Sequence, residues 1–128
     1  MEVEIFDPSG MAPPVGAYSQ VARVPLPGAD LLIISGQLAP DLDKDDLIDQ
    51  MSQAMEQIRL AVEGCGGSMR DVVKLTTFVT RIERRPEMRA IRERYFGARF
   101  PTSTLLQVAG LVDPRALVEI EAIAVVAR

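Results

Sequence analysis

The sequence predicts an α+β domain in which two helices cover one face of a mixed six-stranded sheet. Strand-like and helix-like patterns follow one another in the order strands, helix, strand, helix, strands. The length of 128 residues fits one domain spanning residues 1–128, and 48% apolar with 25% charged residues is typical of globular proteins. Some strands carry apolar residues in both alternating positions, which predicts a sheet that needs cover on two faces.

Three strands are expected before the first helix. A short strand precedes Asp7, and residues 7–16, rich in proline and glycine, follow it as an ordered loop. Residues 18–24 and 31–35 form the next two strands, with a turn over residues 25–30 between them. Two strands joined by so short a turn predict an antiparallel hairpin.

The first helix has a clear start, stripe and end. The aspartates within residues 41–46 supply N-capping carboxylates. Apolar residues then recur at helical steps of three and four: Leu47, Met51, Ala54, Met55, Ile58, Ala61 and Val62. Gly64, Gly66 and Gly67 are expected to end this helix, because glycine tolerates the left-handed conformation of a helix end.

The remaining elements are a strand, a second helix and two closing strands. Residues 72–80 are β-branched and strand-like, and Pro86 fits the first turn of a helix. The inward residues of that helix are expected to be Met88, Ile91 and Tyr95. Residues 102–111 and 117–126 are predicted to be the closing strands.

Residues 31–34 and 117–126 are apolar on both faces of the predicted sheet. Two amphipathic helices can cover only one of these faces. The uncovered face predicts burial against other copies of the chain, so we expect a homo-oligomer.

Composition argues against several classes of protein. The chain has no histidine and one cysteine, Cys65, which removes histidine-based metal sites and the common nucleophilic dyads. We therefore expect no metal and no cofactor. No apolar run approaches the roughly 20 residues that span a bilayer, and the acidic residues 1–7 do not resemble a signal peptide. A cytoplasmic location without membrane association is the expectation.

Charge argues against nucleic acid as a partner. The net charge is −4 and the sequence pI is about 4.8. The arginines within residues 81–94 alternate with glutamates, which is typical of a solvated helix face and not of a phosphate-binding surface.

Six landmarks, in order, give the chain a resemblance over nearly its whole length. They are Gly16-Ala-Tyr-Ser-Gln20, Ile34-Ser-Gly-Gln37, Val72-Val-Lys-Leu-Thr-Thr-Phe-Val79, Tyr95-Phe96 with Phe100-Pro101, Leu106-Gln-Val-Ala-Gly-Leu111, and Val118-Glu-Ile-Glu-Ala-Ile-Ala124. With these motifs the chain resembles the RidA (YjgF) family. The resemblance implies a chorismate-mutase-like fold and a homotrimer whose sheets form a central barrel, with a small-molecule cleft at each subunit interface.

The resemblance also implies an activity, the hydrolysis of enamines and imines derived from amino acids, as in 2-iminobutanoate/2-iminopropanoate deaminases. Carried over by position, Tyr18 lines the cleft, Gly36 is the cleft glycine, and Glu119 is the catalytic glutamate that positions water. Leu105 is a further substrate-binding candidate.

One position departs from the family pattern. The family's carboxylate-binding arginine lies two residues after the proline of the Phe-Pro motif, and here Ser103 holds that position. A guanidinium binds a carboxylate through two charge-assisted hydrogen bonds, each worth about 1.5–3 kcal/mol, whereas one neutral hydroxyl bond contributes roughly 1 kcal/mol. We expect Ser103 to be a weaker polar contact, and the family's usual substrates to bind poorly. Arg115 and Arg23 are either replacement cations or ordinary surface residues.

The sequence leaves the role of Glu119 and the function open. Glu119 lies on the same strand face as Glu121 and is either a water-activating acid/base or a structural acceptor at a subunit interface. The first function is a divergent imine deaminase-like hydrolase. The alternative is a non-catalytic trimer that binds a metabolite or has a regulatory role, and a chorismate-mutase activity rests on fold analogy alone.

Overall fold

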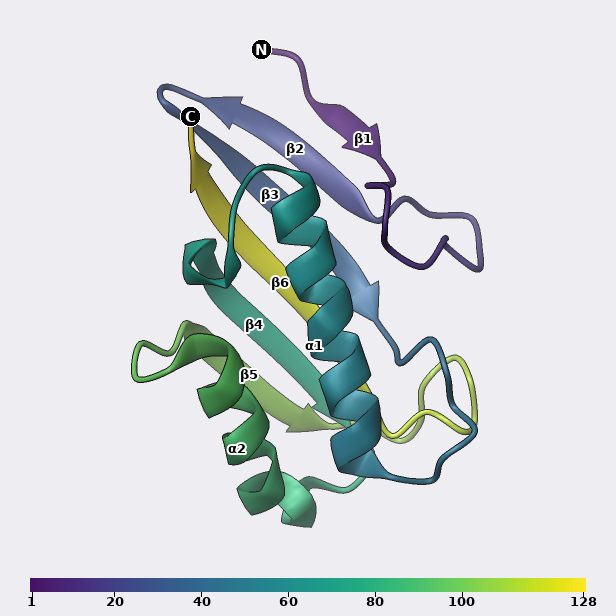
Figure 1. Cartoon of the computed structure of the whole chain (residues 1–128). Coiled ribbons are helices and arrows are strands. Elements are labelled where there is room, and N and C mark those ends of the chain that lie inside the picture. Colours follow the sequence, from purple (N-terminus) through teal and green to yellow (C-terminus); the bar gives the residue numbers. More distant parts are fainter.

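A computed structural model describes residues 1–128 and contains one sheet with spatial strand order β1-β2-β3-β6-β4-β5 (Figure 1). The elements are β1 Glu4–Phe6, β2 Val21–Leu26, β3 Ala29–Gln37, α1 Leu47–Gly64, β4 Val72–Val79, α2 Arg85–Phe96, β5 Thr102–Gln107 and β6 Val118–Ala127, with short 3-10 turns at Met69–Asp71 and Ile82–Arg84. Strands β4 and β5 are parallel and the other neighbours are antiparallel. Both helices lie on the same side of the sheet (Figure 1). The predicted α+β class, with a mixed six-stranded sheet and two helices on one face, is confirmed.

The β2–β3 hairpin is confirmed, but its turn is shorter than predicted. Pro25 and Asp30 pair across the hairpin, so the turn is confined to Pro27 and Gly28, whose φ is 74°. Pro25 is tolerated inside β2 because β1 pairs only as far as Arg23, which leaves one edge of β2 free. Strand β2 also starts three residues later than predicted, at Val21.

Helix α1 follows its predicted boundaries closely. The side chain of Asp46 caps it by accepting hydrogen bonds from the backbone N–H groups of Ile48 (3.0 Å) and Asp49 (3.1 Å). All seven residues of the predicted apolar stripe are buried. The helix ends at Gly64, and Gly66 follows with φ 86°.

One core fills the space between the helices and the sheet. Its helix residues come from α1 and α2, including Met51, Met55, Ile58, Met88 and Ile91. Its strand residues alternate along β3, β4 and β6 and are Leu32, Ile34, Val72, Leu75, Val79, Val118, Ile120, Ala122, Ala124 and Val126. None of the helices is both long and apolar enough to cross a membrane.

The other face of the sheet is apolar and open in this chain. Ile33 is 49% exposed and Val125 is 38% exposed, and they flank half-buried Leu31 and Ile123. The expected apolar residues therefore do lie on both faces of β3 and β6. Burial of the open face against other copies stays a prediction.

The closing strands differ in detail from the prediction. Strand β5 ends at Gln107 instead of continuing to residue 111, and residues 108–117 form a loop that leads into β6. The two closing strands are not neighbours, because β6 lies between β3 and β4 while β5 is the sheet edge. This arrangement brings the loop before β6 next to the end of β3, where a cavity lies.

Candidate functional site

A cavity of about 830 Å³ lies where β3 ends and β6 begins. Its walls are the loop before β2, the end of β3 with the loop that follows it, and the loop before β6. Three of the five residues predicted from the sequence line this one cavity: Tyr18, Gly36 and Glu119. A volume of this size is in the usual range for small-molecule sites, roughly 300–1,000 Å³.

A bulge in β3 places Gly36 against Glu119. Ile34 pairs with Ala122 and Gln37 pairs with Ile120, so β3 has one extra residue at this point. A Cβ on Gly36 would lie 2.8 Å from both Cδ and Oε1 of Glu119. Glycine is therefore the residue that leaves room for the carboxyl group at the base of the cavity.

The carboxyl group of Glu119 is a base with raised proton affinity. Its pKa is raised mainly because burial disfavours the charged form, and the nearby charge of Glu121 adds to this shift. No cation or hydrogen-bond donor of the chain offsets these effects. A carboxyl group in such surroundings holds a proton more tightly than an exposed glutamate does, which suits a group that takes and returns a proton.

Tyr18 forms part of the rim of the cavity. A local turn holds it, because its backbone N–H donates to the carbonyl of Gly16 at 3.0 Å. Its hydroxyl accepts a 3.4 Å hydrogen bond from the backbone N–H of Val15. Tyr18 is 44% exposed and lines the cavity, so it is available to a ligand there.

Buried amides hold the first wall in place, and no pattern in the sequence indicates this role. The side chain of Gln37 donates to Oε1 of Gln20 (2.7 Å) and to the carbonyl of Ser35 (2.9 Å). Gln20 in turn donates to the carbonyl of Ala12 (3.1 Å), and its own backbone N–H donates to Asp7 (2.9 Å). The loop before β2 is thereby fastened to the end of β3.

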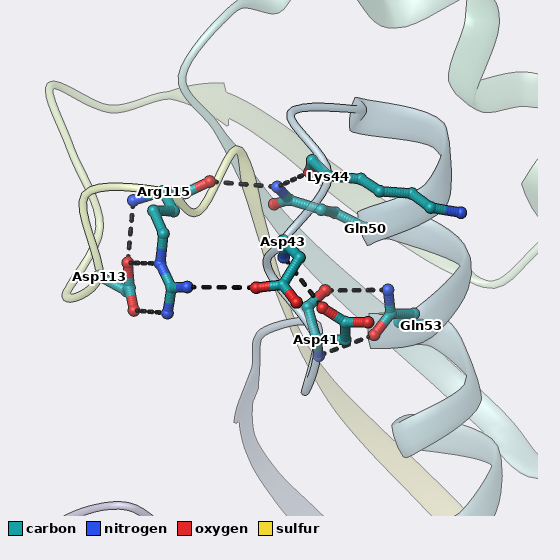
Figure 2. Close-up of polar contacts among 7 residues, drawn as sticks. All are labelled: Asp41, Asp43, Lys44, Gln50, Gln53, Asp113 and Arg115. Carbon is teal, nitrogen blue, oxygen red and sulfur yellow. Dashed lines mark hydrogen bonds and ion pairs between the residues drawn. The ribbon is translucent and has the colours of Figure 1, made fainter.

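A third buried amide joins the other two walls (Figure 2). Gln50 of α1 is fully buried and donates to the carbonyls of Lys44 (3.0 Å) and Arg115 (3.1 Å). Its Oε1 accepts from the backbone N–H of Leu117 at 2.8 Å. The available sequence signal was a polar residue within the apolar stripe of the helix, between Leu47 and Met51.

Arg115 lies on the cavity wall, and its guanidinium is already paired (Figure 2). Nε and Nη2 donate to the two carboxylate oxygens of Asp113 at 3.2 and 3.0 Å. Nη1 lies 3.7 Å from Oδ1 of Asp43. The hydrogen bonds from Arg115 hold the pKa of Asp113 below its usual range, so this pair remains charged.

The other candidate residues lie away from the cavity. Arg23 lies on β2 and pairs with Glu4 (3.1 Å) and, at 3.9 Å, with Asp30. Ser103 and Leu105 lie on the edge strand β5, opposite residues 75 and 77 of β4, which separates them from β6. Ser103 is exposed, whereas Leu105 packs against the core, and neither lines the cavity. Their predicted role in substrate binding stays a prediction.

The charged side chains of the cavity wall are Asp113, Arg115 and Glu119. Much of the remaining wall is apolar and comes from Val15, Leu38, Ala39, Leu42 and Val112, with prolines between them. No group of three or more acidic or cysteine side chains is arranged to hold a metal ion.

Known proteins resemble this chain over nearly its full length. The family model described as Endoribonuclease L-PSP matches residues 9–126. The 3-aminoacrylate deaminase RutC of Acinetobacter baylyi is 33% identical, over 97% of this chain and 98% of that protein. A 2-iminobutanoate/2-iminopropanoate deaminase of Dermatophagoides farinae is 30% identical, over 88% of each chain. The crystal structure of a Rid-family protein, YyfA of Yersinia pestis, superimposes with a TM-score of 0.84 at 29% identity, over 96% of this chain and 98% of that one.

Proposed function

Because this chain belongs to the Endoribonuclease L-PSP family, the family of the RidA (YjgF) proteins, we propose that it is a divergent imine deaminase-like hydrolase that acts in the cavity beside Glu119. The observation that carries this proposal is the carboxyl group of Glu119, which is seated over Gly36 with a raised pKa and no partner in the chain. The two deaminases that the chain resembles act on small imines or enamines by their names, and this chemistry suits a cofactor-free site.

The reaction needs one water and one group that can both accept and donate a proton. The oxygen of the water forms a bond to the imine carbon while the Glu119 carboxylate takes a proton from it. Starting from the protonated imine, Glu119 then returns this proton to the nitrogen and takes the proton of the new hydroxyl group, so that the carbon–nitrogen bond breaks, ammonia leaves and a carbonyl compound forms. The raised pKa of Glu119 makes its carboxylate a stronger base for the first half of this exchange.

The cavity is proposed to be completed in a homotrimer with a chorismate-mutase-like arrangement of subunits. The open apolar face that contains Ile33 and Val125 supports burial of the sheets against one another. In such an assembly, the edge strand β5 of a second copy would bring that copy's Ser103 and Leu105 to the cleft. The mass of the particle in solution tests this step.

The second candidate is a non-catalytic trimer that binds a metabolite in the same cavity. The observation that favours it is Ser103, which stands where the family's arginine grips a carboxylate. A ligand that binds tightly and is never converted would support this function.

RNA is not the proposed substrate, although the family's description contains the word endoribonuclease. The net charge is −4, and two arginines are paired with glutamates of α2: Arg84, just before the helix, with Glu87, and Arg89 with Glu93. A nucleic-acid surface needs cations free to replace the counterions of the phosphates. Cleavage of RNA by the purified protein would contradict this assignment.

The proposal is tested by ammonia release from freshly generated imines, measured above the spontaneous rate. The unmodified protein is compared with Glu119→Ala and Ser103→Arg. Activity of the unmodified protein that is lost in Glu119→Ala supports the hydrolase. A silent unmodified protein that gains activity in Ser103→Arg would instead favour the non-catalytic binding function.

A further inference from the structure

The cavity carries more negative than positive charge, and its single arginine is already neutralised. Asp113 and Glu119 contribute two carboxyl groups to the wall, against one guanidinium from Arg115. Asp43 adds a third carboxylate 3.7 Å from that guanidinium. A ligand therefore meets a site whose uncompensated groups are acidic.

The pairing of Arg115 is built into the local backbone. Pro114 separates Asp113 from Arg115, and the backbone N–H of Arg115 also donates to Oδ1 of Asp113 at 2.9 Å. The side-chain pair is bidentate, with distances of 3.2 and 3.0 Å. Gln50, in turn, holds the carbonyl of Arg115 from the buried helix α1. These contacts turn the guanidinium toward Asp113, although its side chain is 60% exposed.

A substrate carboxylate is disfavoured at such a site for two reasons. It would lie in one cavity with Glu119 and Asp113, and like charges repel strongly where water is partly excluded. It would also have to displace Asp113 from Arg115, which exchanges one carboxylate partner for another and leaves Asp113 without its partner.

From this charge arrangement we infer that the cavity selects imines that have no carboxylate, namely those formed from amines and not from α-amino acids. The inference rests on the proposed hydrolase and defines its substrate class. The protonated nitrogen of such an imine is a cation that pairs with Glu119, and an alkyl group fits the apolar wall of Val15, Leu38 and Val112. Hydrolysis of R–CH=NH₂⁺ with one water gives the aldehyde R–CHO and NH₄⁺.

Two imines that differ only in the carboxylate provide the test. A flavin amine oxidase forms one from isoamylamine, and a flavin L-amino-acid oxidase forms the other from leucine. Ammonia release above the spontaneous rate gives kcat/KM for each imine. We expect the amine-derived imine to be preferred by about tenfold or more. A preference for the leucine-derived imine would overturn the inference, because it would show that a cation from another subunit serves the cavity.

A pair of variants links the preference to Arg115. Asp113→Asn frees the guanidinium and should move the preference toward the leucine-derived imine. Asp45→Asn, which removes a charge from the nearby loop before α1 without touching Arg115, should leave the preference unchanged. Equal effects of the two variants would mean that general charge sets the preference, which contradicts the role given to the Asp113–Arg115 pair.

Equilibrium binding separates failure of the inference from failure of the proposed hydrolase. Isoamylammonium and 4-methyl-2-oxopentanoate are titrated into the full-length protein by calorimetry. If neither imine is hydrolysed but the ammonium binds more tightly, the hydrolase is wrong and the charge selection stands. If the carboxylate binds more tightly, the charge selection is wrong whatever the outcome of the kinetic assay.

Discussion

Gly36 lies directly against the carboxyl group of Glu119, so that a Cβ at position 36 would come within 2.8 Å of its Cδ and Oε1. The extra residue in β3 creates this approach by shifting the register between Ile34 and Gln37. The backbone of one strand therefore sets the position of the catalytic candidate on its neighbour.

Gly36→Ala is expected to reduce activity more than stability. The added methyl group meets the end of a flexible side chain, so Glu119 can move aside at small cost, but its carboxyl group then leaves the base of the cavity. Gly110→Ala is the matched control, because a Cβ there meets nothing within 4 Å. Thermal unfolding and ammonia release are measured for both variants. Equal activity of the two variants would contradict the positioning role of Gly36.

Glu119→Gln should stabilise the protein at neutral pH. The pKa of Glu119 is raised in the fold, so the folded state binds this proton more tightly than the unfolded state does. Stability contributed by the protonated group is present below the unfolded pKa of about 4.3 and is lost as pH rises through the higher folded pKa. Glutamine has no titrating group, so Glu119→Gln does not lose stability as pH rises through this range. Its melting temperature, followed from acid to neutral pH, should exceed that of the unmodified protein only at the upper end, whereas a lower value there would contradict the raised pKa.

Gln50→Ala should destabilise the protein and loosen two walls of the cavity. The change leaves the carbonyls of Lys44 and Arg115 and the N–H of Leu117 without this partner, and a buried unsatisfied group costs about 1–3 kcal/mol. Gln53→Ala, on the exposed side of the same helix, removes hydrogen bonds to Asp41 and Asp49. It should lower the free energy of unfolding less than Gln50→Ala does. Denaturant unfolding measures both. The role given to Gln50 fails if the two variants lose equal stability.

Asp46→Ala tests the predicted start of α1. It removes a side chain that accepts two backbone hydrogen bonds at the helix N-terminus, so we expect a loss of about 1 kcal/mol in the free energy of unfolding. Asp45→Ala removes the same charge one residue earlier, outside the N-cap position, and should change stability much less. A similar loss in both would assign the effect to charge and not to capping.

The sequence predicted elements where local chemistry decides the structure. The cap at Asp46, the apolar stripe that begins at Leu47, and the two-sided apolar pattern of β3 and β6 are all present. The predicted strand boundaries were wrong where tertiary contacts decide where a strand begins or ends. Strand β2 starts later than predicted because the Asp7 side chain accepts a hydrogen bond from the backbone N–H of Gln20. Strand β5 ends earlier than predicted because residues 108–117 turn toward β6.

The candidate site was predictable only through the family resemblance, which implies that Tyr18, Gly36 and Glu119 share one cleft; all three line the cavity. The bulge at Gly36 has no local sequence signal apart from the glycine itself. The pairing of Arg115 with Asp113 also depends on a loop conformation that Gln50 holds from α1. Long-range polar contacts of this kind leave no periodic pattern in a sequence.

A comparison of Glu119→Gln with Glu121→Gln tests whether Glu119 itself performs the proton transfer in imine hydrolysis. Both residues lie on the same face of β6, but only Glu119 lines the cavity. Ammonia release from the isoamylamine-derived imine is measured for each protein. We expect Glu119→Gln to lose roughly 10²–10⁴-fold in rate while Glu121→Gln keeps nearly full activity. Equal rates for the two variants, or a Glu119→Gln protein as active as the unmodified chain, would contradict it.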